Sequence, residues 1–179
     1  MKTFLLLLCL PILTFAHPHM FVDVDMTLTM KENQVQKAAI SWTFDDMNSQ
    51  ILLMDYDKNR DGKFDEKEAL FFKGEVFDKL GDYEYYTHIM IDGKKVLIDN
   101  RHSDFHLSFE KNHFIVHYTV SLADVPQKKS VEFGFWDKEF FSSFDIEEKS
   151  VHFKGQKLPL MIDDIEKDIY MGIVLKLAL

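Results

Sequence analysis

FVDVDMTLTM, residues Phe21–Met30, alternates polar and apolar side chains at every step after its first residue. Successive side chains of a β-strand point to opposite faces, so this period of two predicts a strand with one buried face. The segment also holds several β-branched residues, which fit a pleated surface. The predicted buried face carries Val22, Val24, Met26, Leu28 and Met30.

A second strand follows directly and makes a hairpin. Residues 31–33 (Lys-Glu-Asn) form the predicted turn, and residues 35–44 return beside the first strand. Asp92-Gly93 marks another hairpin turn. Further strands are predicted at 85–91, 95–98, 102–109, 113–122, 131–136, 151–153 and 170–177. The expected fold class is α+β, a mostly antiparallel β-sheet domain with one helical insertion.

The helical insertion is predicted between the second and third strands, at about residues 46–81. Asp45 or Asp46 can cap its first helix. Its second helix is expected to start near Asp65 and to end before Gly81, a natural helix stop. That second helix would carry an apolar stripe at helical spacing, formed by Ala69, Phe72, Val76 and Leu80.

The segment between the two helices, DKNRDGKFDEKE at Asp57–Glu68, fits an EF-hand calcium loop at each ligand position. Gly62 stands where that loop turns sharply. The loop occurs once and contains several basic residues, so we expect modest affinity and a structural role for Ca²⁺. The predicted Ca²⁺ ligands are Asp57, Asn59, Asp61, Lys63 through its backbone carbonyl, Asp65 and Glu68.

Residues 1–16 read as a cleaved signal peptide. A basic Lys2 precedes a Leu-rich apolar stretch, and Ala16 ends a small-residue cleavage site. We therefore expect residues 17–179 to form a single periplasmic domain. The only cysteine, Cys9, falls within the signal. An exported chain without disulfides favours a bacterial periplasm over a eukaryotic secreted domain.

Charge and motif content exclude several classes of function. The formal net charge of −9 disfavours binding to nucleic acid and suits cationic partners. No nucleophile–base arrangement and no phosphate-binding glycine loop stands out in the sequence. We therefore expect a protein that is not an enzyme.

The predicted mature amino terminus is His17-Pro18-His19. Cleavage after Ala16 gives His17 a free α-amine beside its imidazole, and His19 offers a second imidazole. Nitrogen ligands of this kind suit Ni²⁺, Co²⁺, Cu²⁺ and Zn²⁺. The alternative is that two terminal histidines bind nothing. A similar choice applies to the strand histidines His102, His106, His113 and His117, which either meet across a hairpin or are simply half-buried.

Three segments together resemble a bacterial periplasmic family of unknown function. They are residues 17–23 (HPHMFVD), residues 42–46 (WTFDD) and residues 135–141 (FWDKEFF). Members are often named periplasmic components of ABC-type transport systems and are associated with nickel/cobalt exporters. The third segment departs from the family pattern, with Trp136 in place of Tyr and Lys138 in place of Pro. The resemblance implies accessory function in metal transport, with His17 and His19 as transition-metal ligands.

The favoured interpretation is a periplasmic metal-binding accessory protein linked to nickel/cobalt transport, with a structural calcium EF-hand. Its expected partners are metal ions and an inner-membrane metal transporter, and no nucleic acid. One alternative is a calcium-stabilised periplasmic adaptor that binds no transition metal. Another is a copper metalloenzyme that uses the amino-terminal histidines.

Overall fold

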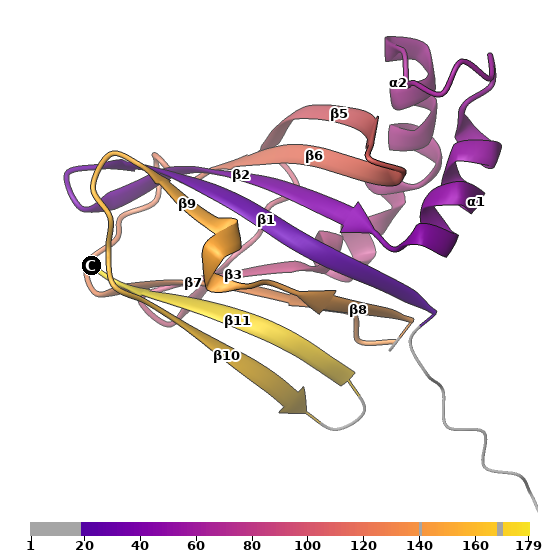
Figure 1. Cartoon of the computed structure of the whole chain (residues 1–179). Coiled ribbons are helices and arrows are strands. Elements are labelled where there is room, and N and C mark those ends of the chain that lie inside the picture. Colours follow the sequence, from indigo (N-terminus) through magenta and orange to yellow (C-terminus); the bar gives the residue numbers. More distant parts are fainter. Residues whose placement is uncertain (1–18, 140, 168–169) are drawn as a thin grey trace, which may run out of the picture.

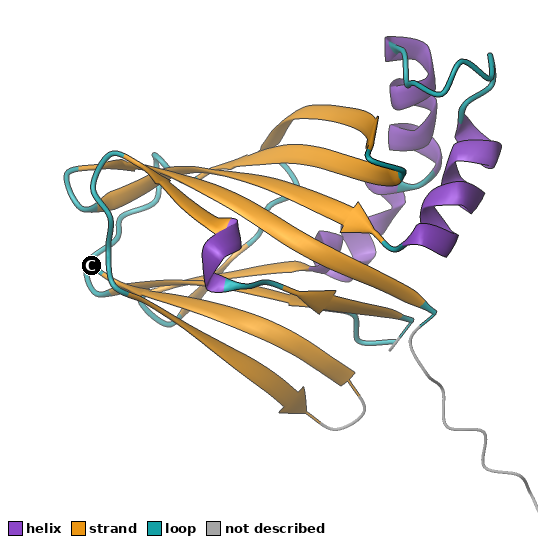
Figure 2. Ribbon diagram, viewed as in Figure 1, coloured by secondary structure: helices purple, strands orange, loops and turns teal. Residues whose placement is uncertain are grey.

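The computed structural model describes residues 19–139, 141–167 and 170–179. Two β-sheets lie one above the other, and the two long helices lie together at one end of the molecule (Figure 1). Figure 2 shows that strands, joined by loops, make up most of the rest. One hydrophobic core contains side chains from both sheets and from the helices.

The larger sheet has the strand order β5-β6-β2-β1-β8, and β9 also pairs with β1. The β1–β2 hairpin predicted from the alternating sequence is present, with Val24 opposite Trp42. Strands β8 and β9 run parallel to β1, whereas the other pairs in this sheet are antiparallel. The strands are β1 (Met20–Lys31), β2 (Gln34–Phe44), β5 (His102–Glu110), β6 (His113–Ser121), β8 (Ser142–Asp145) and β9 (Val151–Lys154).

The smaller sheet has the order β10-β11-β7-β3-β4, and all its pairs are antiparallel. A buried hydrogen bond of 2.6 Å joins the Thr87 hydroxyl in this sheet to the Tyr118 hydroxyl in the larger one. The strands are β3 (Thr87–Ile91), β4 (Lys94–Val96), β7 (Ser130–Trp136), β10 (Leu160–Lys167) and β11 (Tyr170–Ala178). The prediction of a mostly antiparallel β structure with a few helices is confirmed.

A helix–loop–helix unit joins β2 to β3, where the insertion was predicted. Helix α1 (Asp46–Tyr56) has Asp45 as its N-cap, and α2 (Glu66–Glu75) starts with a capping box. The second helix ends earlier than the predicted Leu80. The chain leaves α-helical geometry at Val76 and continues as the 3₁₀ segment η1 (Phe77–Tyr86). A second 3₁₀ turn, η2 (Glu148–Ser150), precedes β9.

The early end of α2 has a packing reason. Phe77, directly after the helix, is almost fully buried, and its ring lies 5.2 Å from that of Tyr118 and 6.1 Å from that of Trp42. Helix α2 ends at its C-cap Val76, and the next residue, Phe77, packs in the core beneath the larger sheet.

Candidate functional site

The loop between α1 and α2 turns its polar oxygens inward. Asn59 Oδ1 accepts the N–H of Asp61 at 2.8 Å, and Asp61 Oδ1 accepts the N–H of Lys63 at 2.8 Å. Asp57 Oδ2 accepts the N–H of Gly62 at 2.8 Å across the sharp turn. Gly62 has a φ of +77°, a region that a residue without Cβ enters at little cost. The predicted turn residue is therefore where the loop needs it.

The far end of the loop is fixed by a reciprocal cap. Asp65 Oδ1 accepts the N–H of Glu68 at 2.9 Å, and Glu68 Oε2 accepts the N–H of Asp65 at 3.1 Å. The other Glu68 oxygen accepts the N–H groups of Lys58 and Asn59. Glu68 thus ties the start of the loop to the start of α2.

The two carboxylates that frame the loop are buried. Asp57 is 7% exposed and Glu68 is 5% exposed. Burying a carboxylate costs free energy unless hydrogen bonds or a cation compensate for the lost hydration. Within the part of the chain that the structure describes, neither carboxylate forms an ion pair with a Lys or Arg side chain. Backbone N–H groups alone compensate for both.

The chemistry of these oxygens suits a hard cation, but their present positions are not those of a formed metal site. Among the described residues, no three His, Cys, Asp or Glu side chains converge closely enough to hold a metal ion. The Glu68 carboxylate is engaged by the backbone of Lys58 and Asn59. Bidentate binding to a cation would require Glu68 to give up those hydrogen bonds.

The loop is also anchored to the larger sheet. The Phe64 ring, just after the turn, lies 5.0 Å from the Phe114 ring on β6. Phe72 of α2 lies 5.2 Å from the same ring. The second half of the loop and α2 therefore pack on the same buried phenylalanine of the larger sheet.

The structure places His19 beside the start of α1. Its backbone N–H donates to the carbonyl of Phe141 at 2.8 Å, and its carbonyl accepts from Asn48 Nδ2 at 2.9 Å. The exposed imidazole lies 5.0 Å from the Phe141 ring. His17 and the predicted signal peptide, residues 1–16, lie outside the described residues, so the paired-histidine site stays a prediction.

Asp45 connects the segments that meet here. Its carboxylate accepts the N–H of Asn48 at 2.9 Å, the Nδ2 of Asn48 at 2.8 Å and the N–H of Phe21 at 3.0 Å. Partial burial opposes ionisation, but the hydrogen bonds from Asn48 and Phe21 lower the pKa of Asp45 below its usual value. With His19 on Phe141, all three segments that carry the family resemblance come together at this end of the molecule.

Asp137, in the third of the resemblance segments, has a structural role that the sequence patterns did not reveal. It is almost fully buried, and its carboxylate accepts the N–H groups of Glu139, Phe141 and Ser142 between 2.8 and 3.1 Å. These bonds hold the loop after β7 so that Phe141 reaches His19. The signal available in the sequence was an Asp followed by a short polar turn, which is common in loops of every kind.

The strand histidines divide into two groups. The rings of His106 and His117 stack at 4.3 Å, and His117 also bonds to Ser41 and Ser108. His102 instead packs 5.5 Å from Phe77. A bulge between Ser103 and His106 separates His102 from His106, so His106 meets His117 across the hairpin and His102 does not.

Another histidine, His88, is buried in the smaller sheet. Its ring stacks on Trp136 at 3.6 Å, and its Nδ1 lies 3.0 Å from the Glu84 carboxylate. Burial lowers the pKa of His88 despite that carboxylate. Partial burial opposes ionisation of Glu84, but hydrogen bonds from Lys95 and His88 lower its pKa to about 2. Glu84 thus forms an ion pair with Lys95, and His88 is a hydrogen-bonded neighbour whose lowered pKa disfavours its charged form.

In the part of the chain that the structure describes, no helix is both long and apolar enough to cross a lipid bilayer.

Two curated proteins, both described as uncharacterised, are similar in sequence. A 15.5 kDa protein from the trpE 3′ region of Spirochaeta aurantia is 32% identical over 92 residues, which is 51% of this chain and 65% of that protein. A protein of Haemophilus influenzae is 28% identical over 131 residues, which is 72% of this chain and 61% of that protein. The chain thus spans less than two thirds of the length of either relative. A family model described as a protein of unknown function matches residues 3–160. The chain therefore belongs to that family, DUF1007, as the resemblance of its three motif segments implied.

Proposed function

We propose that this protein is an exported, non-enzymatic metal-binding accessory protein whose helix–loop–helix unit is an EF-hand stabilised by Ca²⁺. The amino-terminal histidines would take up Ni²⁺, Co²⁺, Cu²⁺ or Zn²⁺ for a membrane transporter in the periplasm. The calcium part of the proposal rests on the loop, and the transition-metal part rests on the sequence at His17 and His19.

One observation carries the calcium proposal. Asp57 and Glu68 frame the loop, are both buried and have no cationic partner among the described residues. Asn59 and Asp61 bring further side-chain oxygens to the loop between them, each already oriented by a backbone N–H. Ca²⁺ prefers six to eight oxygen ligands drawn from carboxylates, amides and backbone carbonyls, and this loop supplies those types at EF-hand spacing.

Calcium titration by calorimetry tests this proposal. We expect one site per chain, with a Kd of about 10⁻⁴–10⁻³ M, in the range of extracellular modules. Glu68→Gln removes one carboxylate charge and should abolish the heat of binding, whereas Glu66→Gln changes an exposed carboxylate on the same helix and should keep it. Equal calcium affinity in all three proteins would reject the site.

The transition-metal proposal needs correctly processed protein. A preparation that starts at His17 would have its α-amine and imidazole available together, whereas one additional residue before His17 would block the α-amine as a ligand. We expect the extended form to bind Ni²⁺ or Cu²⁺ more weakly by calorimetry. The affinity that His19→Ala loses measures how much the second imidazole contributes to metal binding. Equal binding by the processed and extended proteins would contradict the proposal.

A second candidate function is a calcium-stabilised adaptor, and an exposed apolar stripe on α1 favours it. Met47, Ile51 and Met54 follow helical spacing and are exposed, with Met54 79% exposed. Leu70 and Phe71 on α2 are exposed as well. Contiguous exposed apolar side chains often mark protein-binding surfaces, and methionine adapts to varied partners.

One binding assay, with a membrane extract from the source organism, distinguishes the two candidate functions. Met54→Glu should release an adaptor's partner, whereas His17→Ala and His19→Ala should leave it bound. The melting temperature of Met54→Glu should stay close to wild type, because the side chain is exposed. A partner lost with the histidines but kept with Met54→Glu would support metal delivery instead.

A further inference from the structure

A histidine and an aspartate lie opposite each other at the start of α1. His113 is the first residue of β6, and Asp46 is the first residue of α1. His113 Nε2 lies 3.7 Å from Asp46 Oδ1. Asp46 is exposed and His113 is half-buried, so a dissolved ion can reach both side chains.

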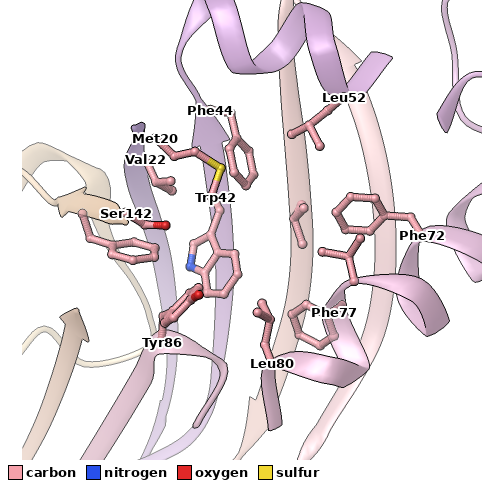
Figure 3. Close-up of a pocket in the computed structure, with 13 residues that line it drawn as sticks. Met20, Val22, Trp42, Phe44, Leu52, Phe72, Phe77, Leu80, Tyr86 and Ser142 are labelled. Atoms are coloured by element: carbon pink, nitrogen blue, oxygen red, sulfur yellow. The ribbon is translucent and has the colours of Figure 1, made fainter. Parts of the chain in front are cut away.

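The backbone fixes which nitrogen of His113 is available to a ligand. Its Nδ1 lies 2.9 Å from the carbonyl oxygen of Phe44. A carbonyl oxygen only accepts, so Nδ1 carries the proton of the neutral ring and Nε2 carries the lone pair. Phe44 is itself fixed in place, because its ring lines an apolar cavity of about 100 Å³ between the larger sheet and the helical insertion (Figure 3). His113 is thus held as metal-binding imidazoles usually are, with the other nitrogen hydrogen-bonded to the protein.

The separation of the two side chains suits a shared cation. A lone pair and a carboxylate oxygen repel each other, and 3.7 Å is too long for a hydrogen bond. Two ligand atoms of one tetrahedral Zn²⁺, each about 2.0–2.2 Å from the ion, lie about 3.4 Å apart. His113 and Asp46 therefore lie close to the spacing that two ligands of one metal ion require.

The surroundings of this pair are negatively charged. The strand register puts Asp23 on the same face of the larger sheet as His113. Partial burial and the carboxylates of Asp145 and Glu147 raise the pKa of Asp23 above its usual value, and His113 opposes that rise. A surface on which carboxylates repel one another in this way attracts divalent cations.

The amino-terminal segment enters the domain beside the pair. Asn48 Nδ2, in the first turn of α1, donates to the His19 carbonyl at 2.9 Å. Its neighbour Ser49 accepts the N–H of Phe114 at 2.9 Å through Oγ. The first turn of α1 thus holds His19 on one side and the residue after His113 on the other. The two residues that precede His19 in the sequence span at most about 7 Å, and a histidine side chain extends that reach.

We propose that His113 Nε2 and the Asp46 carboxylate are the ligands from the folded domain that complete the amino-terminal transition-metal site. This inference rests on the transition-metal part of the proposed function, in which His17 supplies an α-amine and an imidazole. Those two groups with His113 and Asp46 make four ligands, the usual number for Zn²⁺, and such a nitrogen-rich set also suits Ni²⁺ and Cu²⁺. Among the described residues no third His, Cys, Asp or Glu side chain converges here, so the amino terminus is needed to complete the site.

Calorimetric titration of the processed protein, which starts at His17, with Zn²⁺ tests this inference. We expect His113→Ala and Asp46→Asn each to weaken Zn²⁺ binding by at least about tenfold, since loss of even an outer-shell partner costs about that much. The matched controls come from a second histidine–aspartate pair on the same sheet, with His152 Nε2 and Asp25 Oδ1 3.3 Å apart. His152→Ala and Asp25→Asn should keep the wild-type affinity.

NMR of the imidazole nitrogens gives a second measurement. Zn²⁺ should shift the Nε2 signal of His113 and leave that of His152 in place. No shift of the His113 signal, or an equal shift of both signals, would overturn the inference and leave His113 and Asp46 as an ion pair only. Because Asp46 is exposed, Asp46→Asn should melt at the wild-type temperature, which excludes misfolding as the cause of a lost affinity.

A preparation with one additional residue before His17 separates this inference from the proposed function. Equal Zn²⁺ affinity of the processed and extended proteins would reject the amino-terminal site, and this inference with it. Tighter binding by the processed protein, with no effect of His113→Ala or Asp46→Asn, would reject this inference alone. Tighter binding that both substitutions weaken would support the shared site.

Discussion

Replacing Asp45 by Ala tests the role of this carboxylate as the link between β1 and α1. In the wild-type protein it caps α1 through the N–H of Asn48 and also accepts the N–H of Phe21 at the start of β1. Loss of an N-cap costs about 0.5–2 kcal/mol. Loss of one further exposed hydrogen bond costs about 0.5–1.5 kcal/mol. We therefore expect Asp45→Ala to destabilise the protein by about 1–3.5 kcal/mol.

The assay is urea unfolding at pH 7, with thermal melting as a second measure. For a chain of this size, each kcal/mol lowers the melting temperature by about 2–4 °C, so the expected shift is about 2–14 °C. Asp46→Ala is the matched control, because Asp46 is exposed and its carboxylate lies 3.7 Å from His113 Nε2, beyond hydrogen-bond distance. It should change stability by less than about 0.5 kcal/mol.

The same variant has a pH signature. Hydrogen bonds lower the pKa of Asp45 in the folded state, so its stabilisation is present above the unfolded pKa of about 3.9. It is lost as the pH falls through the lower folded value. The stability difference between wild type and Asp45→Ala should therefore narrow in strong acid. A cost for Asp45→Ala no larger than that for Asp46→Ala would refute the reasoning.

Two other predictions concern the smaller sheet. A Cβ at position 134 would lie 2.0 Å from Trp136 Cζ3, so Gly134→Ala must displace the indole from His88. We expect about 1–3 kcal/mol of destabilisation and an altered near-ultraviolet circular dichroism spectrum, and an unchanged spectrum would contradict this. Glu84 has a depressed pKa of about 2 beside Lys95, so its stabilisation holds above about pH 4.3 and is lost as the pH falls through 2. Glu84→Gln should therefore lower the free energy of unfolding by about 1–2 kcal/mol at pH 7, after solvent screening, and by little at pH 2. A loss of stability independent of pH would contradict the ion pair between Glu84 and Lys95.

Local sequence patterns predicted the structural elements that depend on interactions between neighbouring residues. The alternation at Phe21–Met30 gave β1, and the turn at Asp92-Gly93 has the positive φ angles (+50° and +76°) typical of a tight hairpin. Asp45 as a helix cap and Gly62 as the loop turn were also predictable. Each depends on side chains within a few residues of one another.

Long-range packing decided the rest. The division of the strands into two sheets does not follow from any local period, and strands β8 and β10 were not predicted. The end of α2 depends on burying Phe77 under the larger sheet. The apolar cavity between the larger sheet and the helical insertion is lined by several separate segments of the chain, so no local pattern in the sequence predicts it.

Crystals grown with about 10 mM Ca²⁺ would test the central claim most directly. At that concentration a site with a Kd of about 10⁻⁴–10⁻³ M is largely occupied. The proposal predicts one anomalous-scattering peak inside the loop Asp57–Glu68, with six to eight oxygens about 2.3–2.6 Å away. It also predicts that the Glu68 carboxylate leaves the N–H groups of Lys58 and Asn59 to bind the ion. A loop that keeps those hydrogen bonds and shows no ion would contradict the claim.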